Sequence, residues 1–178
     1  MTSVFLTIGH STRSMPEFAD LSRAFGAEAV VDVRSMRRSR ANPQFNGETL
    51  PDALADWQIG YEAIGELGGL RGRQAGADPA TNALWRVRSF HNYADYALTA
   101  PFAEGFARLL AMGAARRCAI MCAEAVWWRC HRRLIADRLL AAGAGVIHIL
   151  GPGQSQEARL TPGAVVRGDA TVVYPAAP

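Results

Sequence analysis

Short apolar runs alternate with segments of helical periodicity along most of this chain, and this alternation is the feature that most constrains its fold. Runs that are almost continuously apolar and rich in β-branched residues are typical of strands buried on both faces of a parallel sheet. Strands are therefore predicted at 4–10, 29–34, 59–64, 117–122 and 145–150. Because strands that alternate with helices imply βαβ crossovers, the predicted fold class is α/β, a single three-layer domain. We expect a mainly parallel sheet of four or five strands with helices on both faces.

The predicted helices follow apolar spacing and capping signals. The best-defined helix covers 15–26, because Ser14 can cap it, Glu17 stands at the capping-box position and Gly26 closes it. Further helices are predicted within 48–57, 92–113 and 130–143. Gly113 is expected to end the second of these. Long loops are predicted over 35–48 and 65–82, where turn-forming residues dominate.

Composition bounds the class of protein and its organisation. The chain has 178 residues, of which 49% are hydrophobic, which suffices for one core. The domain is expected to cover 1–150, and a Gly/Pro-rich tail over 151–178 is expected to form at most a weak hairpin. The first residues lack signal-peptide features and no run of about 18 apolar residues occurs, so we expect a cytoplasmic protein with no membrane partner. Three cysteines, an odd number, fit a reducing compartment, and Cys118 and Cys122 lie about 13 Å apart along a strand, too far for a disulfide.

Arginine supplies all 19 basic residues, and it is unevenly distributed. Four arginines fall within seven residues of one predicted loop, at positions 34, 37, 38 and 40, and three more stand at 129, 132 and 133. Guanidinium groups suit phosphates and carboxylates, so an anionic small molecule or a nucleic acid is the expected partner. The oligomeric state is not predicted.

Titratable side chains follow three of the predicted strands. His10, Ser11 and Thr12 follow the first, Asp32 and Arg34 end the second, and Cys122 and Glu124 follow the fourth. Ligands of open parallel sheets bind outside the carboxyl ends of the strands, so these groups are expected to share one edge.

A helix that begins near Cys130 adds chemistry to the same edge. A helix N-terminus stabilises negative charge, so Cys122 or Cys130 is expected to be a thiolate near neutral pH. His131 should tend to remain neutral there. Arg132 in the first turn is unfavourable to the helix dipole and suggests an anion bound nearby.

Several motifs together resemble a known family of bacterial and archaeal proteins, catalogued as domain of unknown function 488. The motifs are TIGHSTRSMPEF, VVDVRSMRRSRANPQFN, YEAIGELGG, FHNYADY, MCAEAVWWRCHRRLIADRL and VIHI, which cover nearly the whole chain. The resemblance implies an α/β fold and recurring Gly-His-Ser-Thr, Asp-Val-Arg, Phe-Asn, Cys-Ala-Glu and Cys-His-Arg groups. These correspond to Gly9–Thr12, Asp32–Arg34, Phe45-Asn46, Cys122–Glu124 and Cys130–Arg132. The resemblance implies no established reaction, and any cofactor is unknown.

The residues favour an enzyme that acts on an anionic, nucleotide-like or nucleic-acid-like substrate, as a Cys-dependent hydrolase or transferase. Cys122, Glu124 and His10 are the candidate catalytic residues. The candidate substrate-binding residues are Ser11, Thr12, Asp32, Arg34, Asn46, Cys130, His131 and Arg132. Ordinary phosphatase chemistry is disfavoured, because the first arginine after Cys122 is Arg129 and the compact Cys-x5-Arg loop is missing.

Two alternatives remain open from the sequence. A non-catalytic nucleic-acid-binding or accessory domain would use the same edge and the arginine-rich loop to contact phosphates. A metal or redox sensor would use Cys122, Cys130 and His131, with His10 as a further ligand, although seven residues between the cysteines is wider than usual zinc spacing. No metal ligand is assigned.

Overall fold

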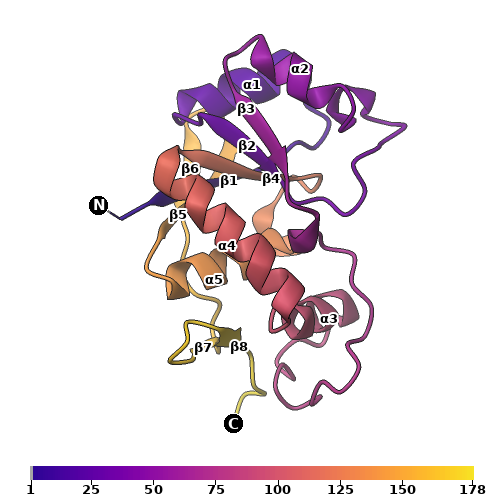
Figure 1. Ribbon diagram of the computed structural model, residues 1–178, viewed down its shortest axis with the longest axis vertical. Helices are drawn as coiled ribbons and strands as arrows, with labels where there is room; N and C mark the ends of the chain where they lie inside the picture. Colours follow the sequence, from indigo (N-terminus) through magenta and orange to yellow (C-terminus); the bar gives the residue numbers. More distant parts are fainter. Residues whose placement is uncertain (1) are drawn as a thin grey trace.

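Six strands form the central sheet, five of them parallel. The computed structural model describes residues 2–178. In chain order the strands are β1 (Val4–Gly9), β2 (Ala29–Asp32), β3 (Gly60–Ala63), β4 (Cys118–Cys122), β5 (Gly145–Gly151) and β6 (Gln154–Glu157). Their order across the sheet is β3-β2-β4-β1-β5-β6, and only β6 is antiparallel to its neighbour (Figure 1). The predicted mainly parallel α/β sheet is confirmed, with β6 as an additional edge strand.

Helices cover both faces of this sheet. The α-helices are α1 (Met15–Ala24), α2 (Leu50–Ala55), α3 (Arg88–Tyr96), α4 (Ala100–Ala115) and α5 (Arg132–Ala141). One core cluster joins the sheet to α1 and α2, and the other joins the opposite face to α3, α4 and α5. Figure 1 shows α1 and α2 above the sheet and the other helices below it.

A local signal accounts for the start of α1, and a contact between distant residues accounts for one glycine inside α4. Ser14 caps α1, with the Ser14 and Glu17 side chains each bonded to the other's backbone N–H, as predicted. The predicted end of a helix at Gly113 is wrong, because α4 continues to Ala115. A Cβ at Gly113 would lie 2.0 Å from the Phe5 ring, so the glycine permits close packing of α4 on β1.

The long loops are nearly free of regular structure. The 35–48 loop contains the short 3-10 helix η1 (Pro43–Phe45), and the Gly-rich loop after β3 begins with η2 (Gly65–Leu67). A third 3-10 turn, η3 (Trp127–Arg129), lies between β4 and α5.

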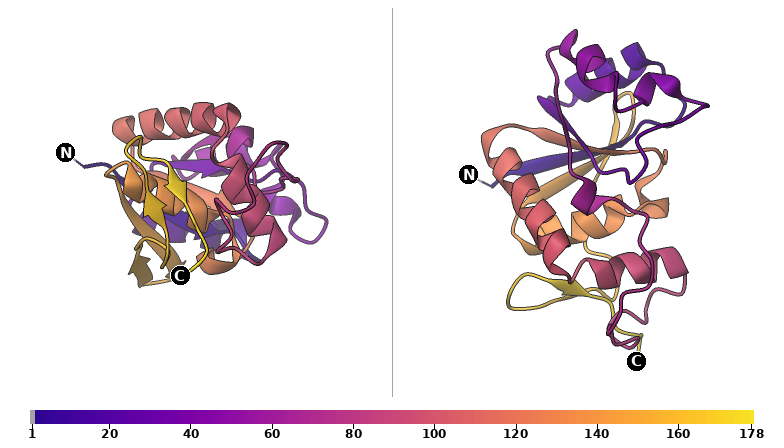
Figure 2. Two further views of the ribbon diagram at one scale, coloured as in Figure 1. Left: turned by 90° about the horizontal axis from the view of Figure 1, so that it is seen from below. Right: turned by 45° about the vertical axis from the view of Figure 1, so that its right-hand side comes forward.

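The segment after β6 returns to the side of the sheet that carries α4 and α5, as both views of Figure 2 show. It contains a two-stranded antiparallel pair, β7 (Val165–Val166) with β8 (Val172–Val173). Tyr174 is buried and its hydroxyl donates to Asp137 Oδ2 at 2.8 Å. The division of the chain at residue 150 stays a prediction. Within residues 2–178, no helix has both the length and the apolar character needed to cross a membrane.

Candidate cysteine site at the carboxyl edge of the sheet

The segments that follow β1, β2 and β4 meet at one edge of the sheet. His10 N donates to the Cys122 carbonyl at 2.8 Å, and Val33 N donates to the Met121 carbonyl at 3.0 Å. Gly9 lies level with Cys122 in the β1–β4 register, and a Cβ on Gly9 would come 1.7 Å from the Glu124 carbonyl oxygen. Glycine is therefore required at this position, because the Cys-Ala-Glu backbone passes directly over it.

The centre of the site is a pair of thiols. Cys122 ends β4, and Cys130 follows η3 just before α5 begins. Their Sγ atoms are 2.7 Å apart, and the residues are only 1% and 2% exposed. Cys118, Cys122 and Cys130 are all free cysteines.

Several hydrogen-bond donors surround the Sγ atom of Cys130. The backbone N–H and the Nε–H of Arg132 each donate to Cys130 Sγ at 3.4 Å, and His131 Nδ1 lies 3.5 Å from the same sulfur. Burial by itself raises the pKa of Cys130. Two sets of contacts together outweigh this effect of burial: the hydrogen bonds from Cys122 and His131, and the positive charges of His131 and Arg132. The pKa of Cys130 therefore lies well below its usual value.

The pKa of Cys122 is shifted in the opposite direction. Burial raises the pKa of Cys122, and the hydrogen bond to Cys130 and the charge of that thiolate raise it further, well above its usual value. We therefore assign the negative charge of the pair to Cys130 and the proton to Cys122.

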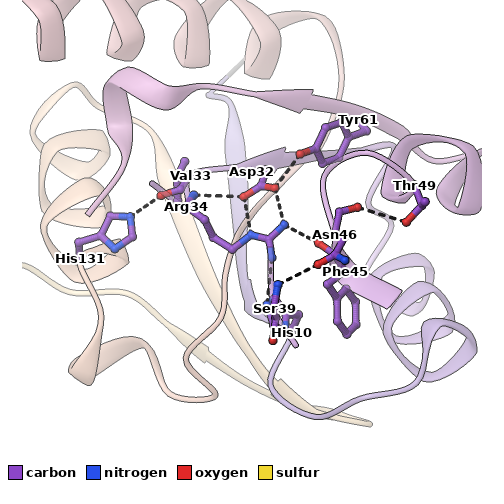
Figure 3. A network of polar contacts seen from close by, with 10 residues as sticks. All are labelled: His10, Asp32, Val33, Arg34, Ser39, Phe45, Asn46, Thr49, Tyr61 and His131. Atoms are coloured by element: carbon purple, nitrogen blue, oxygen red, sulfur yellow. Dashed lines mark hydrogen bonds and ion pairs between the residues drawn. The ribbon is translucent and has the colours of Figure 1, made fainter. Parts of the chain in front are cut away.

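His131 is held so that one nitrogen faces Cys130. Its Nε2–H donates to the Val33 carbonyl at 2.7 Å (Figure 3), which leaves Nδ1 toward the sulfur. Burial lowers the pKa of His131, but the contact with Cys130 and the bond to Val33 outweigh it, so the pKa is raised. The sequence-based expectation of a neutral His131 considered only the helix dipole and omitted this thiolate. The raised pKa favours the imidazolium form.

Arg132 lies beneath the site rather than in the solvent. It is 1% exposed, and its Nη2 donates to the Glu124 carbonyl at 2.7 Å. One guanidinium thus contacts the Cys130 thiolate and fixes the Cys-Ala-Glu backbone. A buried charge of this kind needs such partners.

Asp32 and Arg34 form a buried ion pair (Figure 3), and Arg34 also lines a cavity that the two thiols line. Arg34 Nε and Nη2 donate to Asp32 Oδ1 and Oδ2 at 2.9 and 2.8 Å, and Nη2 also donates to the Phe45 carbonyl at 2.7 Å. Tyr61 donates its hydroxyl to Asp32 Oδ2 at 2.6 Å, and burial followed by this bond raises the pKa of Tyr61 to about 12. The pair fixes the start of the 35–48 loop relative to β2 and β3.

His10 is part of the same network. Its Nδ1 lies 2.8 Å from the Ser11 carbonyl, Arg34 Nη1 lies 3.3 Å from its Nε2, and its ring stacks on Phe45 at 4.3 Å. Burial is the largest cause that lowers the pKa of His10. A neutral His10 therefore donates through Nδ1 and accepts through Nε2, which leaves neither nitrogen free to take a proton from a thiol.

Two adjoining cavities open at this edge. The thiol cavity, of about 240 Å³, is lined by Arg34, Ser35, Met36, Gly69, Leu70, Ser89, Phe90, Cys122, Ala123, Glu124, Arg129, Cys130 and His131. The histidine cavity, of about 390 Å³, is lined by His10, Ser11, Thr12, Arg34, Met36, Arg38, Ser39, Asn42 and Ala123. The two share Arg34, Met36 and Ala123, so the candidate residues lie around adjacent hollows rather than a single one.

The remaining candidates differ in their positions. Ser11 and Thr12 line the histidine cavity, and Ser11 adopts a left-handed backbone conformation with φ 48°. The side-chain oxygen of Asn46 accepts from Ser39 N at 2.8 Å, which places this amide inside the 35–48 loop and outside the lining of both cavities.

Sequence reasoning missed Gly69, which sets the position of His131. A Cβ on Gly69 would lie 2.5 Å from His131 Nδ1. The Gly68-Gly69 pair within the Gly-rich loop was the available signal, but it cannot reveal which side chain packs against it.

A metal ion has one candidate set of ligands within residues 2–178. Ligand atoms of Cys122, Glu124 and Cys130 lie within 4.8 Å of one another. Tetrahedral zinc with bonds of about 2.3 Å separates two sulfur ligands by about 3.8 Å. Here the sulfurs are 2.7 Å apart, closer than a shared zinc ion would hold them, and the Arg132 cation contacts one of them, so the arrangement disfavours a metal centre.

The fold is that of an α/β protein, and its candidate site is centred on two cysteines at the carboxyl edge of the parallel sheet. The chain belongs to the family described as Domain of unknown function DUF488, whose model matches residues 14–139. This range contains both thiols of the site, and it confirms the resemblance seen in the sequence. Neither the curated proteins nor the solved structures gave a match to the chain.

Proposed function

We propose that this protein is a cysteine-dependent enzyme in which the Cys130 thiolate attacks an anionic substrate bound in the thiol cavity. The observation that carries the proposal is the set of donors on Cys130 Sγ, from Arg132 and His131, at the wall of that cavity. A thiolate stabilised by neighbouring cations is the reactive form of cysteine.

The charges around the pair favour an anion. The Cys130 thiolate carries one negative charge. The His131 imidazolium and the Arg132 guanidinium beside it carry two positive charges, so one positive charge is in excess. Arg129 on the cavity wall is exposed and makes no ion pair with the described residues. The charge of Arg34, by contrast, is neutralised by Asp32. The Glu124 carboxylate is the one acidic side chain that lines the cavity.

The proposed step forms a bond between Cys130 Sγ and the electrophilic atom of the substrate. The leaving group departs with its electron pair and takes the proton from Nδ1 of the His131 imidazolium. The Glu124 carboxylate lies within 4.8 Å of both sulfurs, a separation that one water molecule can bridge, so it can receive a proton from the molecule that next accepts the group. Water as that acceptor gives a hydrolase, and any other acceptor gives a transferase.

This proposal moves the nucleophile from Cys122 to Cys130. The sequence analysis predicted Cys122 as the catalytic cysteine because it ends a buried strand. The contacts of the structure favour Cys130 because His131 and Arg132 face that sulfur. In the proposal, His10 orients Arg34 and the 35–48 loop and does not act as the base.

The pH dependence of alkylation tests the proposal. A Cys118→Ala, Cys122→Ser variant leaves Cys130 as the single thiol and keeps a hydroxyl that can donate to it, and Cys118→Ala, Cys130→Ser is the matched control. Cys130 should react with iodoacetamide at a midpoint well below the usual thiol pKa of about 8.5, and Cys122 only above it. Relative to a free thiol, Cys130 should also prefer iodoacetate, which is anionic. A Cys130 midpoint at or above about 8.5 would overturn the proposal.

Nucleic-acid binding is a second candidate function, because the 35–48 loop exposes Arg37, Arg38 and Arg40 beside the histidine cavity. Of these, only Arg38 makes an ion pair, with Glu48. Affinity for a single-stranded oligonucleotide should then fall steeply with salt, and Arg37→Gln with Arg40→Gln should flatten that dependence. An unchanged salt dependence in this double variant would exclude the loop as a phosphate-binding surface.

A further inference from the structure

We propose that the thiol cavity carries out thiol–disulfide exchange, in which Cys130 attacks an anionic disulfide and Cys122 completes the reaction by forming a Cys122–Cys130 disulfide. The inference rests on the proposed function of Cys130 as the nucleophile. It adds the substrate class and gives Cys122 a role of its own.

The first argument is the distance between the two sulfurs. The Sγ atoms lie 2.7 Å apart, against a disulfide bond of about 2.05 Å, so bond formation needs an approach of less than about 1 Å. Cys122 ends a strand at the centre of the sheet, and Cys130 precedes the first turn of α5. The η3 turn can supply this small movement, because it is partly exposed and contains no fully buried residue.

The second argument is what a neighbouring thiol can do to a group carried by Cys130. A thiol that attacks an acyl or phosphoryl group on Cys130 only moves this group from one sulfur to the next. When the carried group is attached through sulfur, the same attack releases it as a thiol and leaves a stable disulfide. A second thiol in contact with the nucleophile therefore favours substrates that react at sulfur.

The third argument is the division of charge within the pair. Cys130 is ionised and ready to attack, while the Cys130 charge helps to keep Cys122 protonated. Once Cys130 carries a substrate sulfur, its charge is gone and that source of the raised pKa of Cys122 is removed. Arg132, whose charge lowers the pKa of Cys122, remains in place to favour the second thiolate.

The reaction balances in atoms and electrons. In the first attack, one S–S bond of the substrate breaks, a Cys130–substrate S–S bond forms, and the leaving thiolate takes the proton of His131. In the second attack, the bond between Cys130 and the substrate sulfur breaks, the Cys122–Cys130 bond forms, and the second leaving thiolate takes the proton of Cys122. The two protein sulfurs are oxidised and the two substrate sulfurs are reduced, so the disulfide is the only oxidant required.

Cys118 supplies an internal control. It is buried in β4, its Sγ lies 3.5 Å from the Arg116 carbonyl, and burial raises its pKa to about 11. It belongs to neither cavity, so Cys118→Ala should leave the exchange reaction unchanged.

The test uses the full chain, reduced and carrying Cys118→Ala, with glutathione disulfide as an anionic probe and cystamine as a cationic one. Intact mass and peptide mapping should show loss of two hydrogen atoms and a bond between Cys122 and Cys130, with no lasting adduct. Adding Cys122→Ser should trap one glutathione on Cys130, and adding Cys130→Ser should leave Cys122 unmodified. Glutathione disulfide should react faster than cystamine.

The failures of the two proposals can be told apart. If alkylation shows Cys130 to be an acidic thiol, but the glutathione adduct on Cys130 persists when Cys122 is present, then Cys122 does not resolve the adduct and this inference is overturned alone. If Cys130 is also inert toward alkylation below the usual thiol pKa, the proposed function is overturned with it.

Discussion

Cys122 and Cys130 touch each other, yet their other neighbours differ in the charge that they favour. Cys130 faces two donors on Arg132 and the ring of His131, whereas the further contact of Cys122 Sγ is the Glu124 carbonyl at 3.9 Å. A carbonyl can accept from a thiol but cannot stabilise a thiolate. The predicted helix N-terminus indicated that Cys122 or Cys130 would be ionised, and the contacts of His131 and Arg132 favour Cys130.

Replacing Arg132 by Met should remove one of the two positive charges beside Cys130. The pKa of Cys130 should then rise, because the positive charge of Arg132 is one of the causes that hold it below its usual value. The pH dependence of iodoacetamide labelling in the Cys118→Ala, Cys122→Ser background measures it.

Arg133→Met is the matched control for that variant. The Arg133 Nε donates to Thr161 Oγ1 at 3.0 Å and its guanidinium lies over the Trp85 ring, away from the thiols. Its labelling curve should follow that of the parent protein. Coincident curves for the Arg132 and Arg133 variants would show that the guanidinium does not stabilise the thiolate.

At the scale of elements, the site depends on glycines where two segments approach closely. The Gly-rich loop after β3 brings Gly68 and Gly69 against the segments that follow β2 and η3. A Cβ on Gly68 would lie 2.4 Å from Ser35 Oγ, and one on Gly69 would lie 2.5 Å from His131 Nδ1. This loop, which has almost no regular structure, thus forms one wall of the thiol cavity.

Gly69→Ala should displace His131 and thereby weaken the Cys130 thiolate. The ring is confined by its bond to the Val33 carbonyl and by the Tyr93 ring at 5.1 Å, so it cannot move without losing a contact. We expect a higher alkylation midpoint for Cys130 and a loss of about 1–3 kcal/mol of unfolding free energy. Gly72→Ala, where a Cβ meets nothing within 4 Å, is the control and should change neither quantity. If Gly69→Ala left the midpoint of Cys130 unchanged, the ring would not be set by this glycine.

The sequence predicts elements well when they bury an apolar face and poorly when they do not. β1, β2 and β4 are almost entirely buried, and their apolar runs identified them. β6 reads Gln-Ser-Gln-Glu, with all four residues exposed, so it has no buried face and no pattern that a sequence could show. Capping of α1 was predictable because Ser14 and Glu17 are neighbours in the chain, whereas the contact of Gly113 with Phe5 joins residues far apart in sequence.

At the scale of the whole molecule, the η3 turn that precedes Cys130 also covers a buried histidine within the sheet. His148 in β5 is 2% exposed, its Nδ1 lies 2.7 Å from Thr7 Oγ1, and Trp127 from η3 stacks on its ring at 4.3 Å. Trp127 thus packs the η3 turn against the sheet while Cys130, just beyond it, faces Cys122. His148 is thus a hydrogen-bonded core residue, and the turn that leads to the proposed nucleophile rests on the sheet.

The free energy of unfolding should therefore depend on the protonation of His148. Burial, and then the charge of Arg132, lower the pKa of His148 from 6.5 to about 4. A histidine with a depressed pKa stabilises the fold fully above pH 6.5, and this contribution of about 3 kcal/mol is lost as the pH falls from 6.5 to 4.

Urea unfolding between pH 7.5 and 4 should show the loss in the parent protein, and His148→Gln, which cannot titrate, should show a shallower decline. His10 also has a lowered pKa and His131 a raised one, but both are present in the two proteins, so the difference between the curves isolates His148. Parallel curves would mean that His148 titrates alike in the folded and unfolded chain, and that Trp127 and the sheet do not shield it from protonation.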